Sequence, residues 1–374
     1  NKEVYAAIDK VFGLPCILQT TVPRVGTGLA NALAALAPGN LNKVWLGAHG
    51  GAEAVEGAIK IAELASKKHK FVSTDNSYHG KTRGAVSVTG RKKWSKDQAT
   101  LENVEVVPFG NAEALEDVLK KGDVAAFFIE PIQGEGGVNV PPEGYLKKVR
   151  ELCTKYDVLF VADEIQSGVG RTGTFFAVEG EDVVPDIIVF AKGISGGLLP
   201  LGGYITNDEV WNKAFGTIQT CTLHTTTFNN DTLCSAVGLA TIEYMLKNDV
   251  MESVKEKGEY LMSKLNEIKD KYPCIKEVRG RGLFVGVEFQ PVDSLAEMMG
   301  APADMADELL GTMMCNELIS EYNILVSYTL NQARVIRVTP PLVVSYEELD
   351  YFLQSFESAI AKNMDLLGIE LTTA

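Results

Sequence analysis

Short apolar runs that end abruptly at polar, Gly or Pro positions recur along the first two hundred residues. Runs of this length are typical of strands buried in a parallel sheet. Three of them end directly at a charged residue: 124–129 before Glu130, 158–162 before Asp163, and 186–191 before Lys192. Helical segments alternate with the runs. This alternation predicts an α/β fold in which helices cover both faces of a mostly parallel central sheet.

The rest of the chain extends this arrangement and then changes it. Further strands are expected at 44–46, 71–74 and 104–107, and helices at 28–36 and 54–62. A long helical stretch covers 233–271. Beyond it we expect one strand over 280–288, a helix over 303–321, strands at 324–327 and 335–338, and a helix over 346–364.

These patterns predict an N-terminal helical segment (1–43), a large domain that holds the site (44–272) and a smaller α+β C-terminal domain (273–374). The first residues show neither a start methionine nor a signal-peptide pattern. We therefore expect the chain to begin inside a longer product, with its N-terminal segment truncated.

The composition limits the partners and the compartment. With 35 basic and 49 acidic residues, the net charge of −14 argues against nucleic acid or an anionic membrane as a partner. No apolar stretch is long enough to span a bilayer. Six scattered cysteines without a CxxC pair indicate reduced thiols in a cytoplasmic protein. The four histidines lack metal-ligand spacing, so we expect no metal.

The charged strand ends are the leading candidates for a site, because ligands of open α/β sheets bind at the carboxyl ends of the strands. Taken alone, Lys192 would be interpreted as a cap on strand-end carbonyls. Asp163 changes this interpretation. Pyridoxal phosphate needs an amine to bind its aldehyde and an acid to keep its ring nitrogen protonated.

The same cofactor needs a phosphate cradle and a ring against one face. Gly51 and Ala52 open an expected helix, whose backbone N–H groups and dipole favour a phosphate. Tyr78 follows an expected strand and offers a ring for stacking. Nucleotide motifs are excluded, since the segment that starts at Asp75 lacks the first glycine of a P-loop and 280–282 leads into a strand.

Longer motifs surround these residues. They are DEIQSGVGRTG at 163–173, PDI at 185–187, AK at 191–192, EPIQGEGG at 130–137 and YHG at 78–80. With them, the chain resembles the class III (ω-amine) aminotransferases from about Leu36 to Met364. That resemblance implies the fold of aspartate aminotransferase, called fold type I. Within the family, the segments 224–228 and 329–337 look most like those of putrescine and ornithine aminotransferases.

The resemblance implies pyridoxal 5′-phosphate as the cofactor and a role for each matching residue. Lys192 would bind the cofactor aldehyde covalently and then move a proton between substrate and cofactor. Asp163 would pair with the pyridine nitrogen. Gln166 would bond the phenolic oxygen, and Tyr78 would stack on the ring.

Further matches imply a shared site and a substrate clamp. Gly51 and Ala52 would bind the phosphate through backbone N–H groups. Thr227 would reach the phosphate of the partner subunit, which implies a homodimer. Arg337 would bind the α-carboxylate of glutamate or 2-oxoglutarate as a fork. Glu135 would neutralise Arg337 when an amine without an α-carboxylate is bound.

Two segments depart from the family. His49-Gly50-Gly51-Ala52 stands where Asn-Ser-Gly-Thr is usual, which removes two hydroxyl donors, and Asn229-Asn230-Asp231 stands where Gly-Gly-Asn is usual. The favoured reaction moves an amino group from putrescine, ornithine or another ω-amino acid to 2-oxoglutarate. Two alternatives stay open: a PLP-dependent amino-acid racemase or epimerase, and a degenerate homologue without catalysis.

Overall fold

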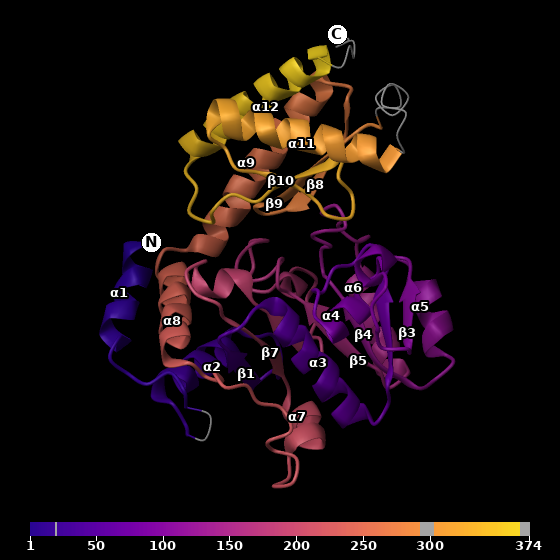
Figure 1. Ribbon diagram of the computed structural model, residues 1–374, viewed down its shortest axis with the longest axis vertical. Coiled ribbons are helices and arrows are strands. Elements are labelled where there is room, and N and C mark those ends of the chain that lie inside the picture. Colours follow the sequence, from indigo (N-terminus) through magenta and orange to yellow (C-terminus); the bar gives the residue numbers. More distant parts are fainter. Residues whose placement is uncertain (19–20, 292–302, 367–374) are drawn as a thin grey trace. The chain divides into compact units, whose positions relative to one another are not determined.

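The computed structural model describes residues 1–18, 21–291 and 303–366, and these residues form two compact units (Figure 1). Unit 1 comprises Asn1–Pro131, Pro141–Gly170 and Thr174–Met251. Unit 2 comprises Ile132–Val140, Arg171–Gly173 and the described residues from Glu252 onward. The domain limits expected from the sequence stay a prediction.

A seven-stranded sheet forms the centre of unit 1, in the order β1-β7-β6-β5-β4-β2-β3. Its strands are β1 Lys43–Gly47, β2 Lys70–Thr74, β3 Val104–Val107, β4 Val124–Ile129, β5 Leu159–Asp163, β6 Ile187–Phe190 and β7 Gly202–Thr206. The strands from β6 to β3 pair in parallel, whereas β7 runs antiparallel to both β6 and β1. The expected mostly parallel sheet is confirmed.

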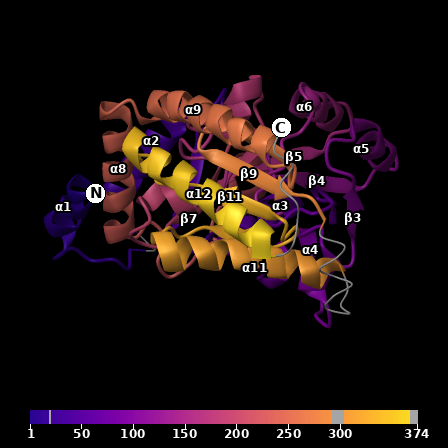
Figure 2. The ribbon, with the colours of Figure 1, turned by 90° about the horizontal axis from the view of Figure 1, so that it is seen from above.

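Helices cover both faces of this sheet, as expected. They are α1 Lys2–Val11, α2 Arg24–Leu36, α3 Gly51–Ser66, α4 Arg83–Val88, α5 Ala112–Leu119, α6 Tyr145–Lys155, α7 Asp208–Phe215 and α8 Thr232–Lys247, with 3₁₀ turns at Lys92–Ser95, Ala177–Glu181 and Lys192–Ser195. Figure 2 shows α3 and α4 on one side of β3–β5 and α5 and α6 on the other. Val55, Ala58 and Ile59 of α3 recur at helical spacing and are buried in the same core as Phe71 and Phe128 of the sheet.

The sequence pattern does not predict β7, because Gly202 and Gly203 interrupt its apolar run. Gly203 pairs with Leu46 of β1 and Phe190 of β6. A Cβ atom at Gly203 would lie 2.0 Å from the carbonyl oxygen of Trp45. The close approach of the strands therefore requires glycine where a strand residue is usually larger.

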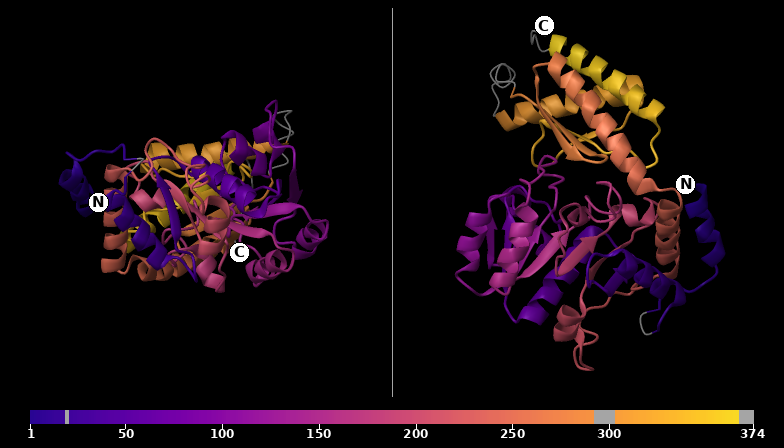
Figure 3. Two further views of the ribbon diagram at one scale, coloured as in Figure 1. Left: turned by 90° about the horizontal axis from the view of Figure 1, so that it is seen from below. Right: turned by 180° about the vertical axis from the view of Figure 1, so that it is seen from behind.

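Unit 2 contains a four-stranded antiparallel sheet in the order β10-β11-β9-β8. The strands are β8 Ile275–Arg281, β9 Phe284–Phe289, β10 Ser327–Tyr328 and β11 Val335–Val338, and the helices are α9 Val250–Lys271, α11 Ala303–Tyr322 and α12 Tyr346–Leu366. Helix α11 packs against α12 and against β10 and β11. The back view in Figure 3 shows the helices of this unit beside its sheet. The expected smaller α+β part is confirmed.

Three expected elements need correction. The single strand over 280–288 is a hairpin of β8 and β9, which turns at Gly282 with a φ of +55°. The strand at 324–327 is wrong except for Ser327 in β10. The stretch 233–271 is two helices, because the chain breaks at Asp249, whose φ of +47° leaves the right-handed helical region. Among the described residues, no helix is long and apolar enough to cross a membrane.

Candidate active site

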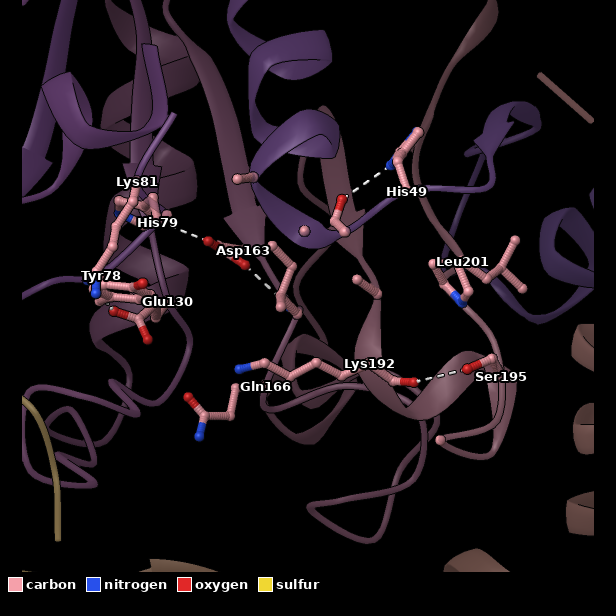
Figure 4. A pocket seen from close by; sticks show the side chains of 18 of the residues that line it. His49, Tyr78, His79, Lys81, Glu130, Asp163, Gln166, Lys192, Ser195 and Leu201 are labelled. Atoms are coloured by element: carbon pink, nitrogen blue, oxygen red, sulfur yellow. Dashed lines mark hydrogen bonds and ion pairs between the residues drawn. The ribbon is translucent and has the colours of Figure 1, made fainter. Parts of the chain in front are cut away.

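A pocket of about 420 Å³ lies in unit 1 where several strands end (Figure 4). The turn from β1 into α3 and the segment after β2 contribute to its wall, as do the residues that follow β4, β5 and β6. Six predicted site residues line it: Gly51, Ala52, Tyr78, Asp163, Gln166 and Lys192. The rule that ligands bind at the carboxyl ends of strands thus locates the pocket correctly.

Lys192 follows β6 directly and begins a 3₁₀ turn that ends at Ser195. Its φ of +48° lies in the left-handed region, which is unfavourable for a residue with a side chain. Figure 4 shows its amine directed toward Gln166 and away from Ser195. A strained, exposed lysine directed into a pocket is an arrangement expected for function more than for capping a strand.

Asp163 is the last residue of β5, and its carboxylate is buried. One oxygen, Oδ1, accepts the N–H of Ile165 at 3.0 Å. The other, Oδ2, lies 2.6 Å from Nδ1 of His79. His79 is missing from the residues predicted for the site, although it stands beside Tyr78 in one of the family motifs.

The His79 side chain is fully buried, and its Nε2 atom has no hydrogen-bond partner among the described residues. Burial lowers the pKa of His79, but the hydrogen bond with Asp163 and the charges of Asp163 and Glu130 outweigh it and raise the pKa above its ordinary value. His79 therefore places an imidazole that gains a proton more easily beside the Asp163 carboxylate. A carboxylate in this position can stabilise a protonated ring nitrogen.

Glu130 is one of the three charged strand ends from which the sequence predicted the site, but its role there was not predicted. It is buried at the end of β4 and lines the pocket. Its Oε1 accepts the backbone N–H of Tyr78 at 2.9 Å. The carboxylate therefore fixes the main chain that presents the Tyr78 ring to the pocket.

The N-terminus of α3, where the sequence predicts an anion cradle, has no side-chain cap. Its N-cap, Gly50, makes no side-chain capping bond, so the first turn of the helix presents its N–H groups without a side-chain acceptor. A Cβ atom at Gly51 would lie 2.7 Å from Cδ1 of Ile165. Glycine at this position therefore lets the helix start approach the segment after Asp163.

His49 does not replace the hydroxyl donor that the family usually has before this helix. Its Nδ1 lies 2.9 Å from the carbonyl oxygen of Gly50, and its ring stacks on Trp45 with 4.7 Å between centroids. Burial lowers the pKa of His49. The imidazole therefore packs against an aromatic ring, and the groups that the helix start offers to an anion are backbone N–H groups.

Lys81 also lines the pocket. Its Nζ lies 4.5 Å from the centroid of the Trp94 ring, and the ring of Tyr78 meets Trp94 edge-on at 6.3 Å. The sequence assigns Lys81 no role. Its position gives the pocket wall a cation besides Lys192.

Glu135 and Arg337 belong to unit 2 and contact each other there. Nη1 of Arg337 donates to Oε1 of Glu135, and the backbone N–H of Leu330 donates to Oε2 at 3.0 Å. Nη2 of Arg337 donates to Oγ of Ser327 at 3.0 Å. The expected carboxylate–guanidinium pair is therefore present.

Thr227 is exposed in unit 1, on the segment between α7 and α8, and is not among the residues that line the pocket. The segment is tied to β1, since the N–H of Ala48 donates to the carbonyl of Phe228. The polar residues that follow also have structural reasons. Asn230 has a φ of +54°, which asparagine tolerates, and Asp231 accepts the N–H of Cys234 as the N-cap of α8.

Comparison with known proteins identifies the family. The family model described as aminotransferase class-III matches residues 15–360. The chain is a class III aminotransferase. It uses pyridoxal phosphate, and the lysine, the buried carboxylate and the uncapped helix start all suit that cofactor. Family membership supports transamination over racemisation or a non-catalytic role.

Two curated relatives have similar sequences. An uncharacterized aminotransferase of Schizosaccharomyces pombe is 44% identical over 372 residues, a match that covers 97% of this chain and 75% of the relative. Aminotransferase PigE of Serratia is 35% identical over 369 residues, covering 90% of this chain. The same match covers 43% of the length of PigE.

Solved structures share the fold. An ornithine aminotransferase from Toxoplasma gondii, with partial occupancy of PLP, has a TM-score of 0.86 at 29% identity, and the match covers 98% of this chain and 84% of the other. An ω-transaminase from Pseudomonas jessenii in complex with PMP has a TM-score of 0.89 at 26% identity, covering 99% and 86%. These likenesses confirm the expected fold type I.

Proposed function

We propose that this aminotransferase moves the terminal amino group of a diamine or ω-amino acid to 2-oxoglutarate, giving an aldehyde and glutamate. Putrescine is the favoured donor, and ornithine or another ω-amino acid is the next candidate. The contact between Glu135 and Arg337 is the observation on which this proposal depends. The likeness to an ornithine aminotransferase supports the same class of donor.

The pair explains how one enzyme serves substrates of different charge. While Glu135 holds Arg337, the guanidinium has no uncompensated charge and does not penalise a donor that lacks an α-carboxylate. When the Glu135 side chain turns away, Arg337 is available to bind the α-carboxylate of an acceptor in a fork. Lys81, on the wall of the unit 1 pocket, is a further cation that we propose attracts a carboxylate.

The residues of the pocket divide the remaining work. Pyridoxal phosphate, when bound, supplies a ring that withdraws electrons from the carbon bearing the amino group. We propose that Nζ of Lys192 binds the cofactor and later removes and returns a proton. Asp163 would keep the ring nitrogen protonated, and Gln166 and Tyr78 would orient the ring. The N–H groups of Gly51 and Ala52 would hold the phosphate.

We also propose that the enzyme is a homodimer in which Thr227 reaches the cofactor phosphate of the partner subunit. Large apolar side chains are exposed near the N-terminus and around Thr227: Phe12, Leu14, Ile17, Val22, Ile218, Leu223 and Phe228. Exposed apolar side chains favour burial against another chain. A second copy would bring the exposed hydroxyl of Thr227 to a phosphate.

The substrate proposal is tested with a panel of amines, each paired with 2-oxoglutarate or pyruvate, using enzyme loaded with pyridoxal phosphate. We expect putrescine with 2-oxoglutarate to give the highest kcat/KM. Arg337→Ala should weaken the binding of 2-oxoglutarate by roughly 10- to 100-fold and the binding of putrescine much less. An equal loss for both substrates would show that Arg337 is not the carboxylate clamp.

Mixing two defective variants tests the shared site. Lys192→Ala lacks the amine, and Thr227→Val lacks the hydroxyl. In a dimer with shared sites, a mixed dimer has one site with neither defect, so mixing after mild dissociation should restore part of the activity. No recovery, or a single-chain mass by light scattering, would exclude the shared site.

A further inference from the structure

The guanidinium of Arg337 is held at two nitrogen atoms by side chains from separate segments of unit 2. Nη1 contacts Glu135, and Nη2 donates to Oγ of Ser327 at 3.0 Å. Ser327 lies directly opposite Arg337 in the antiparallel pair of β10 and β11. Cross-strand partners project their side chains on one face of a sheet, so the fold itself places the hydroxyl beside the guanidinium.

The main chain of Glu135 is fixed, so only its side chain is free to leave Arg337. The backbone N–H of Asn331 donates to the carbonyl of Glu135 at 2.9 Å. Two nitrogens of Arg279 donate to the carbonyl of Gly137, at 3.0 and 2.6 Å. Gly137 has a φ of +122°, and a Cβ atom there would lie 2.6 Å from Oε1 of Gln332. Substituting this segment or moving it as a whole would therefore be costly.

Rotation of the Glu135 side chain breaks two hydrogen bonds and leaves a third in place. It separates the carboxylate from Nη1 of Arg337 and from the N–H of Leu330. The hydrogen bond between Nη2 and Ser327 does not involve Glu135 and is unaffected. The hydroxyl accepts from Nη2 with one lone pair, which leaves its own hydrogen available for an anionic oxygen.

We infer that Ser327 is a positioning residue that holds the Arg337 guanidinium ready for the carboxylate of the 2-oxo acid once Glu135 has turned away. The inference rests on the proposed roles of Arg337 and Glu135. Both Arg337 and Ser327 line a pocket of unit 2, so the guanidinium is accessible from within that unit. Without the hydroxyl, the side-chain hydrogen bond that remains to Arg337 among the described residues is the one with Glu135.

This role predicts a split between the two halves of the reaction. The donor amine uses the paired state of Glu135 and Arg337, which does not depend on Ser327. The acceptor uses the separated state, in which Ser327 alone orients the guanidinium. Loss of the hydroxyl should therefore weaken binding of the acceptor and leave binding of the donor unchanged.

The comparison is between Ser327→Val and Ser327→Thr. Valine and threonine are both β-branched and suit a strand, and they differ in that valine has a methyl group where threonine has the hydroxyl. Each half-reaction is followed by the absorbance of the bound cofactor in single-turnover mixing with putrescine or 2-oxoglutarate. Binding of glutarate, a dicarboxylate without the reactive carbonyl, is measured by calorimetry. Ser358→Ala, on the exposed face of α12, is the control.

Ser327→Val should bind 2-oxoglutarate and glutarate roughly tenfold more weakly than the native enzyme, with putrescine within about twofold, and Ser327→Thr should bind all three normally. Equal behaviour of the two variants, or an equal loss in both half-reactions, would overturn the role of Ser327. If Arg337→Ala is selective for the acceptor while Ser327→Val matches Ser327→Thr, only this inference fails. If Arg337→Ala is not selective, the proposed function fails first.

Discussion

Nδ1 of His79 lies 2.6 Å from Oδ2 of Asp163, and both side chains are buried. The two residues are 84 positions apart and come from the segment after β2 and the end of β5. A hydrogen bond with an imidazole holds a buried carboxylate in a fixed position. His79 therefore supports the role proposed for Asp163 without itself needing to contact the cofactor.

Replacing His79 with Phe should lower kcat by roughly 10- to 100-fold, since a hydrogen bond to a charged group is lost inside the protein. Asp163→Asn should lower it further. The pH dependence of the cofactor absorbance should also shift in His79→Phe, which a purely structural role would not cause. His69→Gln is the matched control, because His69 is an exposed surface partner of Glu63. An unchanged kcat and spectrum in His79→Phe would remove His79 from the mechanism.

The sequence predicted those site residues that follow buried strands. Asp163 and Lys192 each end an apolar run, and in a parallel sheet such ends meet at one edge. The glycine pair before a helical pattern was a weaker signal, since an ordinary turn has the same sequence, and the structure places Gly51 in the pocket wall. Local patterns of this kind need no knowledge of distant contacts.

The partners of these residues were harder to predict, because side-chain contacts across the fold leave no periodic signal. His79 and Glu130 both stand in quoted motifs, but nothing local shows that one faces Asp163 and the other holds the N–H of Tyr78. Proximity to Tyr78 was the one available signal for His79. The strand β7 was missed for a related reason: its glycines are explained only by the neighbouring strand at Trp45.

Lys81→Met should distinguish between acceptors. If Lys81 binds the distal carboxylate of 2-oxoglutarate, its loss should raise the KM for 2-oxoglutarate by about tenfold and leave pyruvate, which has no distal carboxylate, unchanged. Lys93→Met is the control, because Lys93 lies over the same Trp94 ring at 4.9 Å but does not line the pocket. An equal effect on both acceptors would assign Lys81 to general attraction of anions.

Glu135→Gln should have the opposite selectivity to Arg337→Ala. Glutamine keeps the shape and one acceptor oxygen but no longer neutralises Arg337, so an uncompensated cation would face the donor. We expect the KM for putrescine to rise by roughly 5- to 20-fold with little change for 2-oxoglutarate. Steady-state kinetics with each substrate varied in turn measures this. A raised KM for 2-oxoglutarate with an unchanged KM for putrescine would contradict the proposed roles of Glu135 and Arg337.

Glu164 provides a prediction about stability and pH. The side chain is fully buried next to Asp163, with hydrogen bonds from Ser167 and from the N–H of Val178. Burial raises the pKa of Glu164 to about 7. Between its ordinary value and pH 7, the folded state keeps a proton that the unfolded state releases. The free energy of unfolding therefore falls as pH rises through this interval and levels off above it.

Glu164→Gln removes this titration, because a glutamine can accept from the N–H of Val178 while its amide donates to the Ser167 hydroxyl. The Tm of Glu164→Gln relative to that of the native protein should rise by roughly 2 to 4 °C between pH 5 and pH 8. Glu151→Gln, on the exposed face of α6, should show no such trend. A Tm difference that stays constant or falls with pH would show that Glu164 is ionised in the folded protein throughout this range. In that case its hydrogen bonds with Ser167 and Val178 would outweigh its burial.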